Sequence, residues 1–201
     1  MKATFLNCTL KPSPERSNGA ALAEVVSAGL EKEGVECIFH RLADLNIPPG
    51  VETDLGDGDE WPKIHSDLLE SEIVVFVTPT WLGRPSSIAQ RALERMDAML
   101  SETDDEDRPV AYGRVAGVVV VGNEDGAHHV ISEISGGLAD IGYTIPGQAW
   151  TYWNRGPGPG DEYCDSDEGK EWSHSTGAAA AQNLVAVARA LAANPPPAPP
   201  S

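Results

Sequence analysis

The chain has 201 residues, and its 14 Lys and Arg against 31 Asp and Glu give a formal net charge of −17. This length favours a single domain, and a hydrophobic content of 41% is enough for a core. The charge argues against nucleic acids and anionic membranes as partners, because clustered Lys and Arg are what mainly hold them.

The apolar run at the N-terminus is too short for a signal peptide, and no stretch reaches the roughly 20 apolar residues of a membrane helix. We therefore expect a cytoplasmic protein. Cys8, Cys37 and Cys164 are far apart and form neither a CxxC pair nor an even set. We interpret them as reduced thiols rather than as a disulfide framework or a metal site.

The first third of the chain alternates apolar runs with amphipathic segments, which predicts strands alternating with helices. A strand over residues 3–7 leads through a polar loop into a helix that Ser17 or Asn18 caps and Gly34 ends. Residues 35–40 alternate as an edge strand does. The predicted buried stripe of the helix consists of Leu22, Val25, Val26 and Leu30.

The middle of the chain contains two almost continuously apolar runs, 73–77 and 115–121, which are typical of central strands covered on both faces. A long connection over residues 41–60 precedes a short helix with Pro62 in its first turn. Ser87-Ile88-Ala89-Gln90 matches a capping box, and the acidic run 102–107 is interpreted as a solvated loop. The helix between them is expected to bury Ile88, Ala92, Met96, Met99 and Leu100.

In the last third, Val130, Ile134, Leu138 and Ile141 predict a fourth helix. Residues 143–145 are expected to form a strand, placed at a sheet edge by the proline that follows. A second long loop, 150–170, is rich in Gly, Pro and acids, and an Ala-rich helix over 173–193 ends the domain. The tail 195–201 has five prolines and is expected to be disordered, which leaves residues 1–194 as the domain.

Five strands alternating with five helices predict an α/β fold, a three-layer, doubly wound, five-stranded parallel sheet. The two expected edge strands favour the order 2-1-3-4-5 over the order of dinucleotide-binding folds. In this arrangement the ligand crevice lies beyond the carboxyl ends of strands one, three and four. Three loops therefore become the candidates for function.

The first loop, residues 8–18, offers hydroxyls, an amide, two cations and the free N–H groups of a helix start, a set that suits a phosphate monoester. It has neither the GxGxxG nor the Walker pattern, which argues against a dinucleotide or nucleoside-triphosphate site. Ordinary helix capping is the alternative interpretation of the loop.

The second and third loops follow the two central strands. Residues 78–87 combine Pro, Gly and Trp81, and can lie along a flat ring, although a structural turn explains Pro and Gly equally well. Residues 122–129 open a helix and include His128 and His129. Adjacent histidines diverge on a helix and no further ligand has suitable spacing, so we assign no metal site.

The three loops resemble the flavodoxin-like family of NAD(P)H-dependent FMN reductases and NAD(P)H:quinone oxidoreductases, from residue 2 to about residue 193. The resemblance implies bound FMN, with its phosphate at Thr9, Lys11, Ser17 and Asn18. It places the flavin ring between two further groups of residues, which are Pro79, Thr80, Trp81, Leu82 and Gly83 on one side and Gly122, Asn123, Glu124, Asp125 and Gly126 on the other. Members often begin the phosphate loop with Gly-Ser-x-Arg, whereas this chain has Cys8-Thr9-Leu10-Lys11, so Arg16 is an alternative cation.

The resemblance also implies a mechanism, in which NAD(P)H passes a hydride to FMN and reduced FMN passes electrons to a quinone, a free flavin or a similar small acceptor. No side-chain acid or base is required, because the cofactor carries the chemistry. His128 is a candidate at the flavin or acceptor, and Tyr152 and Trp153 are candidates for the wall of the acceptor pocket. A homodimer or homotetramer is expected from the resemblance alone.

Two other functions remain open. An FMN-binding electron carrier without a nicotinamide site would use the acidic surface to dock a basic partner. Against it, the phosphate loop lacks the Gly-rich pattern of such carriers, and the long loops 41–60 and 150–170 suggest a built-up pocket. The other is an interaction protein of the same fold that has lost its flavin site. Such a protein would bind no flavin and would be colourless.

Overall fold

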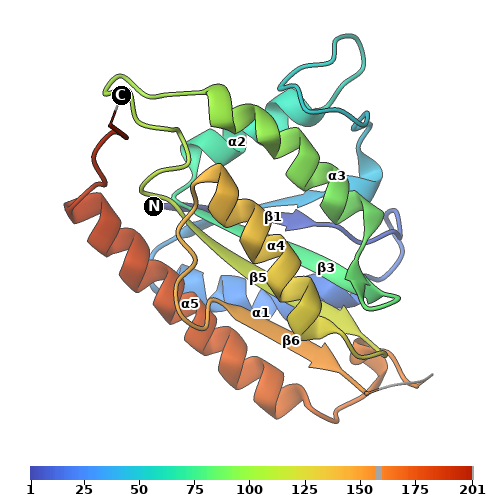
Figure 1. Cartoon of the computed structure of the whole chain (residues 1–201). Helices are drawn as coiled ribbons and strands as arrows, with labels where there is room; N and C mark the ends of the chain where they lie inside the picture. Colours follow the sequence, from blue (N-terminus) through green and yellow to red (C-terminus); the bar gives the residue numbers. More distant parts are fainter. Residues whose placement is uncertain (157–159, 201) are drawn as a thin grey trace.

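The computed structural model describes residues 1–156 and 160–200, which form three layers, with a sheet between two groups of helices (Figure 1). Five parallel strands have the order β2-β1-β3-β5-β6. Their bounds are Lys2–Asn7 for β1, Glu36–Arg41 for β2, Ile73–Trp81 for β3, Val115–Gly122 for β5 and Trp150–Asn154 for β6. A short strand β4, Arg84–Pro85, pairs antiparallel with the end of β3. The expected doubly wound fold and strand order are confirmed, with β4 as an addition.

Helices cover both faces of the sheet (Figure 1). One face carries α1, Asn18–Lys32, and α5, Lys170–Ala193; the other carries α2, Trp61–Glu70, α3, Ser87–Met96, and α4, Ala127–Ile141. Three short 3₁₀ helices are η1, Leu42–Asp44, η2, Asp97–Ser101, and η3, Tyr163–Asp165. The central strands β3 and β5 are buried on both faces, which is why their sequences are almost continuously apolar. No helix in residues 1–156 and 160–200 is long and apolar enough to cross a bilayer.

The prediction of the fifth strand at residues 143–145 is wrong. Of these three residues only Thr144 pairs with the sheet, through an isolated bridge to Val115, and Pro146 cannot continue the ladder because it has no N–H. The strand is β6, which pairs with β5 seven residues further on. The loop expected at 150–170 accordingly begins after β6, and its residues 157–159 lie outside the described residues.

Several helix boundaries also differ from expectation. Ser17 caps α1 as expected, accepting a 3.2 Å hydrogen bond from the Ala20 N–H. The cap of α3 is Ser86 rather than the predicted box at Ser87, because the Ser86 hydroxyl accepts from the Ala89 N–H at 3.1 Å. Leu100, expected in the buried stripe of that helix, is 51% exposed. The last helix begins at residue 170 instead of 173, and residues 195–200 have no helix or strand.

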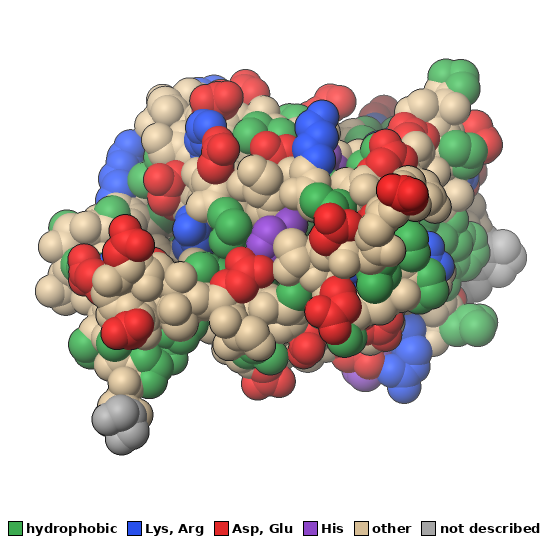
Figure 2. Space-filling model, turned by 90° about the horizontal axis from the view of Figure 1, so that it is seen from above, with side chains coloured by type: hydrophobic (Ala, Val, Ile, Leu, Met, Phe, Trp, Pro, Cys, Tyr) green, Lys and Arg blue, Asp and Glu red, His purple; other side chains and the backbone are tan. Residues whose placement is uncertain are grey.

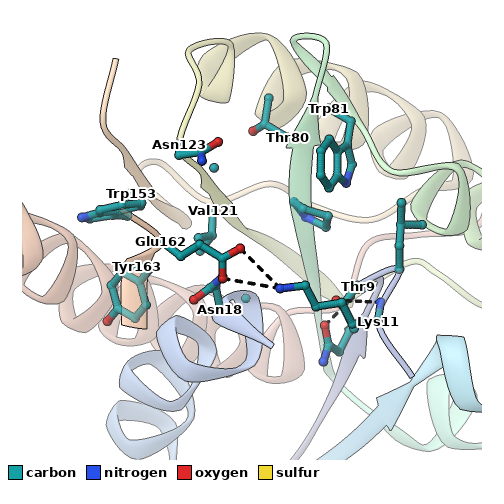
Figure 3. Close-up of a pocket in the computed structure, with 15 residues that line it drawn as sticks. Thr9, Lys11, Asn18, Thr80, Trp81, Val121, Asn123, Trp153, Glu162 and Tyr163 are labelled. Atoms are coloured by element: carbon teal, nitrogen blue, oxygen red, sulfur yellow. Dashed lines mark hydrogen bonds and ion pairs between the residues drawn. The ribbon is translucent and has the colours of Figure 1, made fainter. Parts of the chain in front are cut away.

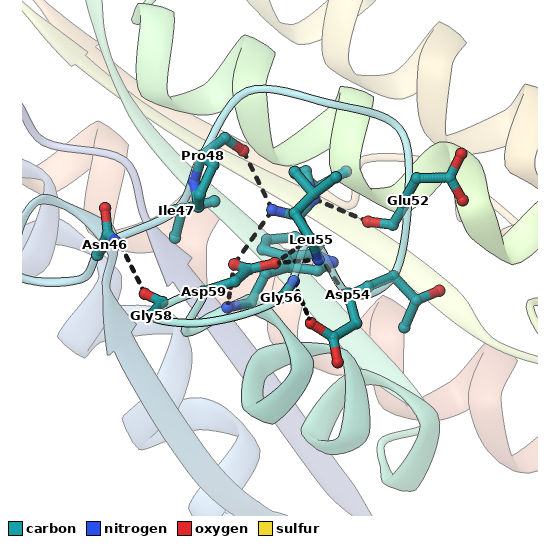
Figure 4. Close-up of polar contacts among 12 residues, drawn as sticks. Asn46, Ile47, Pro48, Glu52, Asp54, Leu55, Gly56, Gly58 and Asp59 are labelled. Atoms are coloured by element: carbon teal, nitrogen blue, oxygen red, sulfur yellow. Dashed lines mark hydrogen bonds and ion pairs between the residues drawn. The ribbon is translucent and has the colours of Figure 1, made fainter.

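The long loop between β2 and α2 is held by one buried ion pair (Figure 4). The Arg95 guanidinium of α3 lies 2.6 Å from Asp59, with both side chains at most 1% exposed. It also donates to the backbone carbonyls of Pro48, Glu52 and Thr53 at 2.9–3.2 Å. Burial alone raises the pKa of Asp59, but hydrogen bonds from Arg95 and from two backbone N–H groups outweigh it and hold this pKa below its ordinary value. The loop is therefore a fixed part of the fold.

Candidate functional site

A cleft opens at the carboxyl ends of β1, β3 and β5, where the strand order predicts the ligand crevice (Figure 3). Its cavity volume is about 200 Å³, below the roughly 300–1,000 Å³ typical of small-molecule and cofactor sites, so a flavin bound there would extend beyond the cavity. The residues that line it are Asn7, Thr9, Leu10, Lys11, Asn18, Gly19, Pro79, Thr80, Trp81, Val121, Gly122, Asn123, Trp153, Glu162 and Tyr163.

The fold brings more than half of the expected site residues together in this cleft. Those that line it are Thr9, Lys11, Asn18, Pro79, Thr80, Trp81, Gly122 and Asn123. Those that do not line it are Ser17, Leu82, Gly83, Glu124, Asp125, Gly126 and His128.

One end of the cleft is formed by the loop from β1 to α1. The Thr9 N–H donates to Asn7 Oδ1 and the Lys11 N–H donates to Thr9 Oγ1, both at 3.3 Å. The side chain of Asn7 also forms hydrogen bonds with the hydroxyl of Ser17. Ser17 therefore supports the loop without lining the cleft. The arrangement directs Lys11 and the N-terminal first turn of α1 toward the cleft, and both favour an anion.

At this end Glu162 reaches in from the segment after β6 (Figure 3). Its carboxylate accepts a 2.6 Å hydrogen bond from Asn18 Nδ2 and lies 3.4 Å from Lys11 Nζ. The hydrogen bond from Asn18, together with the charge of Lys11, holds the pKa of Glu162 below its ordinary value. Glu162 is therefore ionised at neutral pH.

The other part of the cleft is aromatic. Trp81, which is 56% exposed, lies on one side, and Trp153 and Tyr163 lie on the other (Figure 3). Trp153 is anchored by a 2.7 Å hydrogen bond from its Nε1 to the Glu168 carbonyl. The Tyr163 hydroxyl is paired with His174 at 2.7 Å, and burial raises the pKa of Tyr163 to about 12, so this side chain stays neutral. These groups offer flat apolar surfaces.

Thr80 contributes a buried hydroxyl to the same cleft. The residue is 4% exposed, and its Oγ1 has no hydrogen-bond partner within residues 1–156 and 160–200. A buried hydroxyl without a partner is costly, so Thr80 is a candidate for a hydrogen bond to a ligand or to an ordered water.

The loops after β3 and β5 touch through glycine. Leu82 and Gly83 form the turn between β3 and β4, and both have positive φ, 54° and 73°. Gly126 has φ 109°, and a Cβ there would lie 2.7 Å from the Cα of Gly83. Leu82, at the tip, is 93% exposed. These residues shape the rim of the cleft instead of lining it.

His128 lies against the edge strand, away from the cleft lining. Its ring makes edge contacts with Trp150 at 5.4 Å and Tyr152 at 5.1 Å. Tyr152 in turn packs on Trp172 of α5, with ring centroids 4.7 Å apart. Of the two aromatic residues expected to wall an acceptor pocket, Trp153 lines the cleft and Tyr152 does not. In the described part of the chain, no three His, Cys, Asp or Glu side chains are gathered as metal ligands.

Sequence reasoning missed Glu162 and Tyr163 as lining residues. Both lie about 150 positions after the loop they face, inside a segment whose composition indicates only a loop. The alternation of Trp150–Asn154 was the available signal, since recognising β6 places the next residues at the carboxyl edge of the sheet.

Two curated relatives are each a little over one third identical to this chain within the aligned segment. The divalent metal cation transporter MntH of Mycobacterium bovis is 37% identical over 173 residues, which cover 84% of this chain and 25% of that protein. The 8-demethyl-8-aminoriboflavin-5'-phosphate synthase of Streptomyces davaonensis is 36% identical over 171 residues, covering 80% of this chain and 66% of the synthase. The chain thus spans a quarter of the first relative and just under two thirds of the second.

Solved structures agree with the fold. RosB with bound 8-demethyl-8-formylriboflavin-5'-phosphate superimposes with a TM-score of 0.87 at 33% identity, over 98% of this chain and 82% of RosB. An archaeal flavodoxin, 13% identical with a TM-score of 0.56, covers 92% of this chain and 99% of its own, and shows the fold alone.

A family model described as NADPH-dependent FMN reductase matches residues 1–154, from the start of β1 to the end of β6. These residues supply every strand of the sheet and most of the cleft. The chain therefore belongs to the NADPH-dependent FMN reductase family, and the FMN and NAD(P)H expected from its sequence are confirmed as the cofactors of that family.

Proposed function

We propose that the chain binds FMN in the cleft and transfers a hydride from NAD(P)H, through this FMN, to a small acceptor such as a quinone or a free flavin. The observation that carries the proposal is the cleft itself, which combines an anion-binding end with an aromatic end at the topological switch point of the sheet.

The residues present fit FMN at both ends. Lys11, the amide of Asn18 and the N-terminus of α1 would hold the phosphate, because charge-assisted hydrogen bonds and the helix dipole both favour an anion there. Trp81 would cover the flavin ring on one side. The Thr80 hydroxyl, which has no partner in the described part of the chain, would meet a polar atom of the ring edge. A Cβ at Gly19 would lie 3.0 Å from Val77, and one at Gly122 would lie 3.0 Å from Thr80, so glycine allows close packing against β3 at both places.

The chemistry that FMN supplies when bound is hydride acceptance from NAD(P)H and electron delivery to a second acceptor. The protein itself binds the FMN and orients its reaction partners. Trp81 and Trp153 would limit access of water from opposite sides, and the half-exposed ring of Trp81 would be available to stack against a flat ligand. Lining side chains other than Lys11 and Glu162 carry no charge, which keeps the aromatic part of the cleft apolar.

An anaerobic absorbance experiment tests this function. Protein is incubated with FMN, desalted, and mixed with NADPH or NADH. We expect a bound-flavin spectrum that bleaches within the time of a turnover and returns when a quinone or FMN is added. Bound flavin that only dithionite reduces would favour the electron carrier, and protein that retains no flavin in the presence of excess FMN would contradict the proposal.

A second candidate is chemistry on the flavin itself. It is favoured by the identity of 36% to a synthase of 8-demethyl-8-aminoriboflavin-5'-phosphate and by the fit to RosB, whose structure holds a formyl derivative of the same flavin. Mass spectrometry of the flavin recovered after incubation separates the two candidates. An unchanged FMN mass with NADPH consumption supports the reductase, and a changed mass supports the second candidate.

The remaining parts of the proposal concern partners and place. We propose a small-molecule acceptor, a homodimer or homotetramer, and a cytoplasmic location, each of which stays a prediction. Analytical ultracentrifugation checks the oligomer, and fractionation of the source cells checks the location.

A further inference from the structure

A carboxylate of the chain lies where the phosphate of FMN is expected. The Oε2 of Glu162 accepts a hydrogen bond of 2.6 Å from Asn18, and both of its carboxylate oxygens lie 3.4 Å from Lys11 Nζ (Figure 3). Lys11 and Asn18 are the cation and the first-turn amide of the proposed phosphate site. Glu162 therefore occupies the same donors that a phosphate needs.

The whole turn that carries Glu162 is bound to the loop between β1 and α1 and to the start of α1. We call residues 162–165 the acidic turn. Besides Glu162, its Asp165 pairs with Arg16, and its Cys164 N–H donates to Asn18 Oδ1 at 3.1 Å. Both cations that the sequence offers for a phosphate are thus neutralised by one short segment. The acidic turn lies beyond residue 154, where the match to the family model ends.

The N-terminus of α1 explains why an acid binds there. α1 has no acidic residue in its own first turn, so the favourable interaction of a negative charge with the helix dipole comes from another part of the chain. Glu162 is ionised at neutral pH, because the Asn18 hydrogen bond and Lys11 hold its pKa below the ordinary value. The carboxylate is in this respect a substitute for a ligand anion.

Two anions cannot use these donors together. A phosphate monoester carries a charge of about −1.5 to −2 at pH 7 and three acceptor oxygens, so it competes well against one carboxylate. Like charges held within about 4 Å of each other repel strongly in a partly buried site. The Lys11–Glu162 contact is long, and both side chains are about 40% exposed, so it is held weakly.

We propose that Glu162 is an internal competitor for the phosphate site, which leaves Lys11 and Asn18 when FMN binds and so sets the affinity for phosphorylated relative to unphosphorylated flavin. The inference rests on the proposed function, since it concerns the same cleft. A competitor of this kind lowers the affinity for FMN and makes FMN exchangeable, as reduction or modification of free flavin requires.

The test is a pair of dissociation constants, for FMN and for riboflavin, measured by flavin fluorescence. Glu162→Gln keeps the shape of the side chain and removes its charge. We expect this variant to bind FMN about tenfold more tightly than the wild-type protein, and riboflavin equally, because riboflavin has no phosphate. Glu162→Ala, which vacates the site completely, should shift the constants in the same direction.

Asp161→Asn is the matched control. Asp161 is the neighbouring exposed acid and makes no hydrogen bond or ion pair within residues 1–156 and 160–200. Its replacement removes the same charge as Glu162→Gln but no contact with Lys11 or Asn18. The affinity for FMN should therefore stay nearly unchanged. An equal gain in Asp161→Asn would mean that net charge, and not competition at the site, is responsible, and would overturn the inference.

The remaining outcomes separate this inference from the proposed function. If the wild-type protein binds FMN and Glu162→Gln binds it equally or more weakly, the proposed function stands and Glu162 only positions Lys11 and Asn18. If the wild-type protein and both Glu162 variants fail to bind FMN, the proposed function and the inference both fall. Thermal unfolding of each variant verifies that it is folded.

Discussion

At the scale of single residues, the cleft depends on a few polar groups with different tasks. Lys11 supplies charge at the anion-binding end, and Thr80 supplies a hydroxyl that the protein leaves unpaired among the residues described. The first group acts through electrostatics and the second through a hydrogen bond. Their replacement should therefore have distinguishable effects.

Lys11→Ala should weaken FMN binding by roughly 1–3 kcal/mol, the loss typical of a charge-assisted hydrogen bond. Riboflavin binding should change much less. Titration of each flavin into the protein measures both affinities. The control is Lys63→Ala, an equal change of charge at an exposed position of α2. An FMN affinity equal to that of the control variant would remove Lys11 from the phosphate site.

Thr80→Val should move ligand affinity and stability in opposite directions. Loss of the hydroxyl should weaken FMN binding by about 0.5–1.5 kcal/mol, while the melting temperature stays or rises because an unpaired buried group disappears. Thr4→Val is the control: its hydroxyl is equally buried but bonded to Ser71 at 2.8 Å, so this change should lower stability and leave FMN binding intact. A lower melting temperature for Thr80→Val would show instead that the hydroxyl is already satisfied in the protein.

At the scale of elements, the rim of the cleft and the long loop are fixed by close contacts. The contact of Gly126 with Gly83 joins the loop after β5 to the β3–β4 turn. The Arg95–Asp59 pair joins the loop between β2 and α2 to α3. Each contact connects segments that are far apart in sequence, so its loss should affect more than one element.

Gly126→Ala should destabilise the fold by roughly 1–3 kcal/mol, because its φ of 109° disfavours a side chain and the new Cβ would meet backbone atoms of Gly83. Gly136→Ala, inside helix α4 with open space around it, should instead stabilise by about 0.5–1 kcal/mol. Urea unfolding compares the two. Equal stabilities would mean that the two loops separate at little cost.

Arg95→Met should cost about 3–5 kcal/mol, since it leaves Asp59 buried without its cation. Arg189→Met, which removes an exposed pair with Glu33, should cost about 1 kcal/mol at most. Because the pKa of Asp59 is lowered in the folded protein, its stabilisation is present above about pH 4 and is lost as the pH falls through the folded pKa. Denaturant titrations at pH 7 and in acid should therefore show the cost of Arg95→Met shrinking in acid.

The sequence predicts these elements to different degrees. The buried strands β3 and β5 were recognisable because a strand covered on both faces has to be apolar throughout. The edge strand β6 was missed, since Tyr152 and Trp153 are aromatic residues that suit a pocket wall as well as a strand. The position of Glu162 depends on a contact between residues about 150 positions apart, which no local pattern encodes.

At the scale of the whole molecule, the charge of −17 is spread over the surface. Figure 2 shows Asp and Glu side chains distributed over one face, with fewer Lys and Arg among them. An anionic ligand therefore approaches against the overall field and is held only by the local donors of the cleft.

The association rate constant of FMN should accordingly rise with ionic strength, since salt screens the repulsion beyond about 10 Å at 0.1 M. Uncharged riboflavin should associate at a rate that does not depend on salt. Stopped-flow fluorescence in increasing NaCl measures both rate constants. A rate constant for FMN that falls with salt would indicate that Lys11 and Arg16 dominate the approach.

The two ends of the described chain lie on the side of the sheet away from the cleft. β1 begins at residue 2, at the amino edge of the sheet, and Pro196 approaches Gly113, just before β5 begins at the same edge. The cleft opens at the carboxyl edge. A linker to an electrode, a bead or a second protein, attached at either end, would leave the cleft facing away from the point of attachment, so the molecule can be immobilised in one orientation with its site accessible.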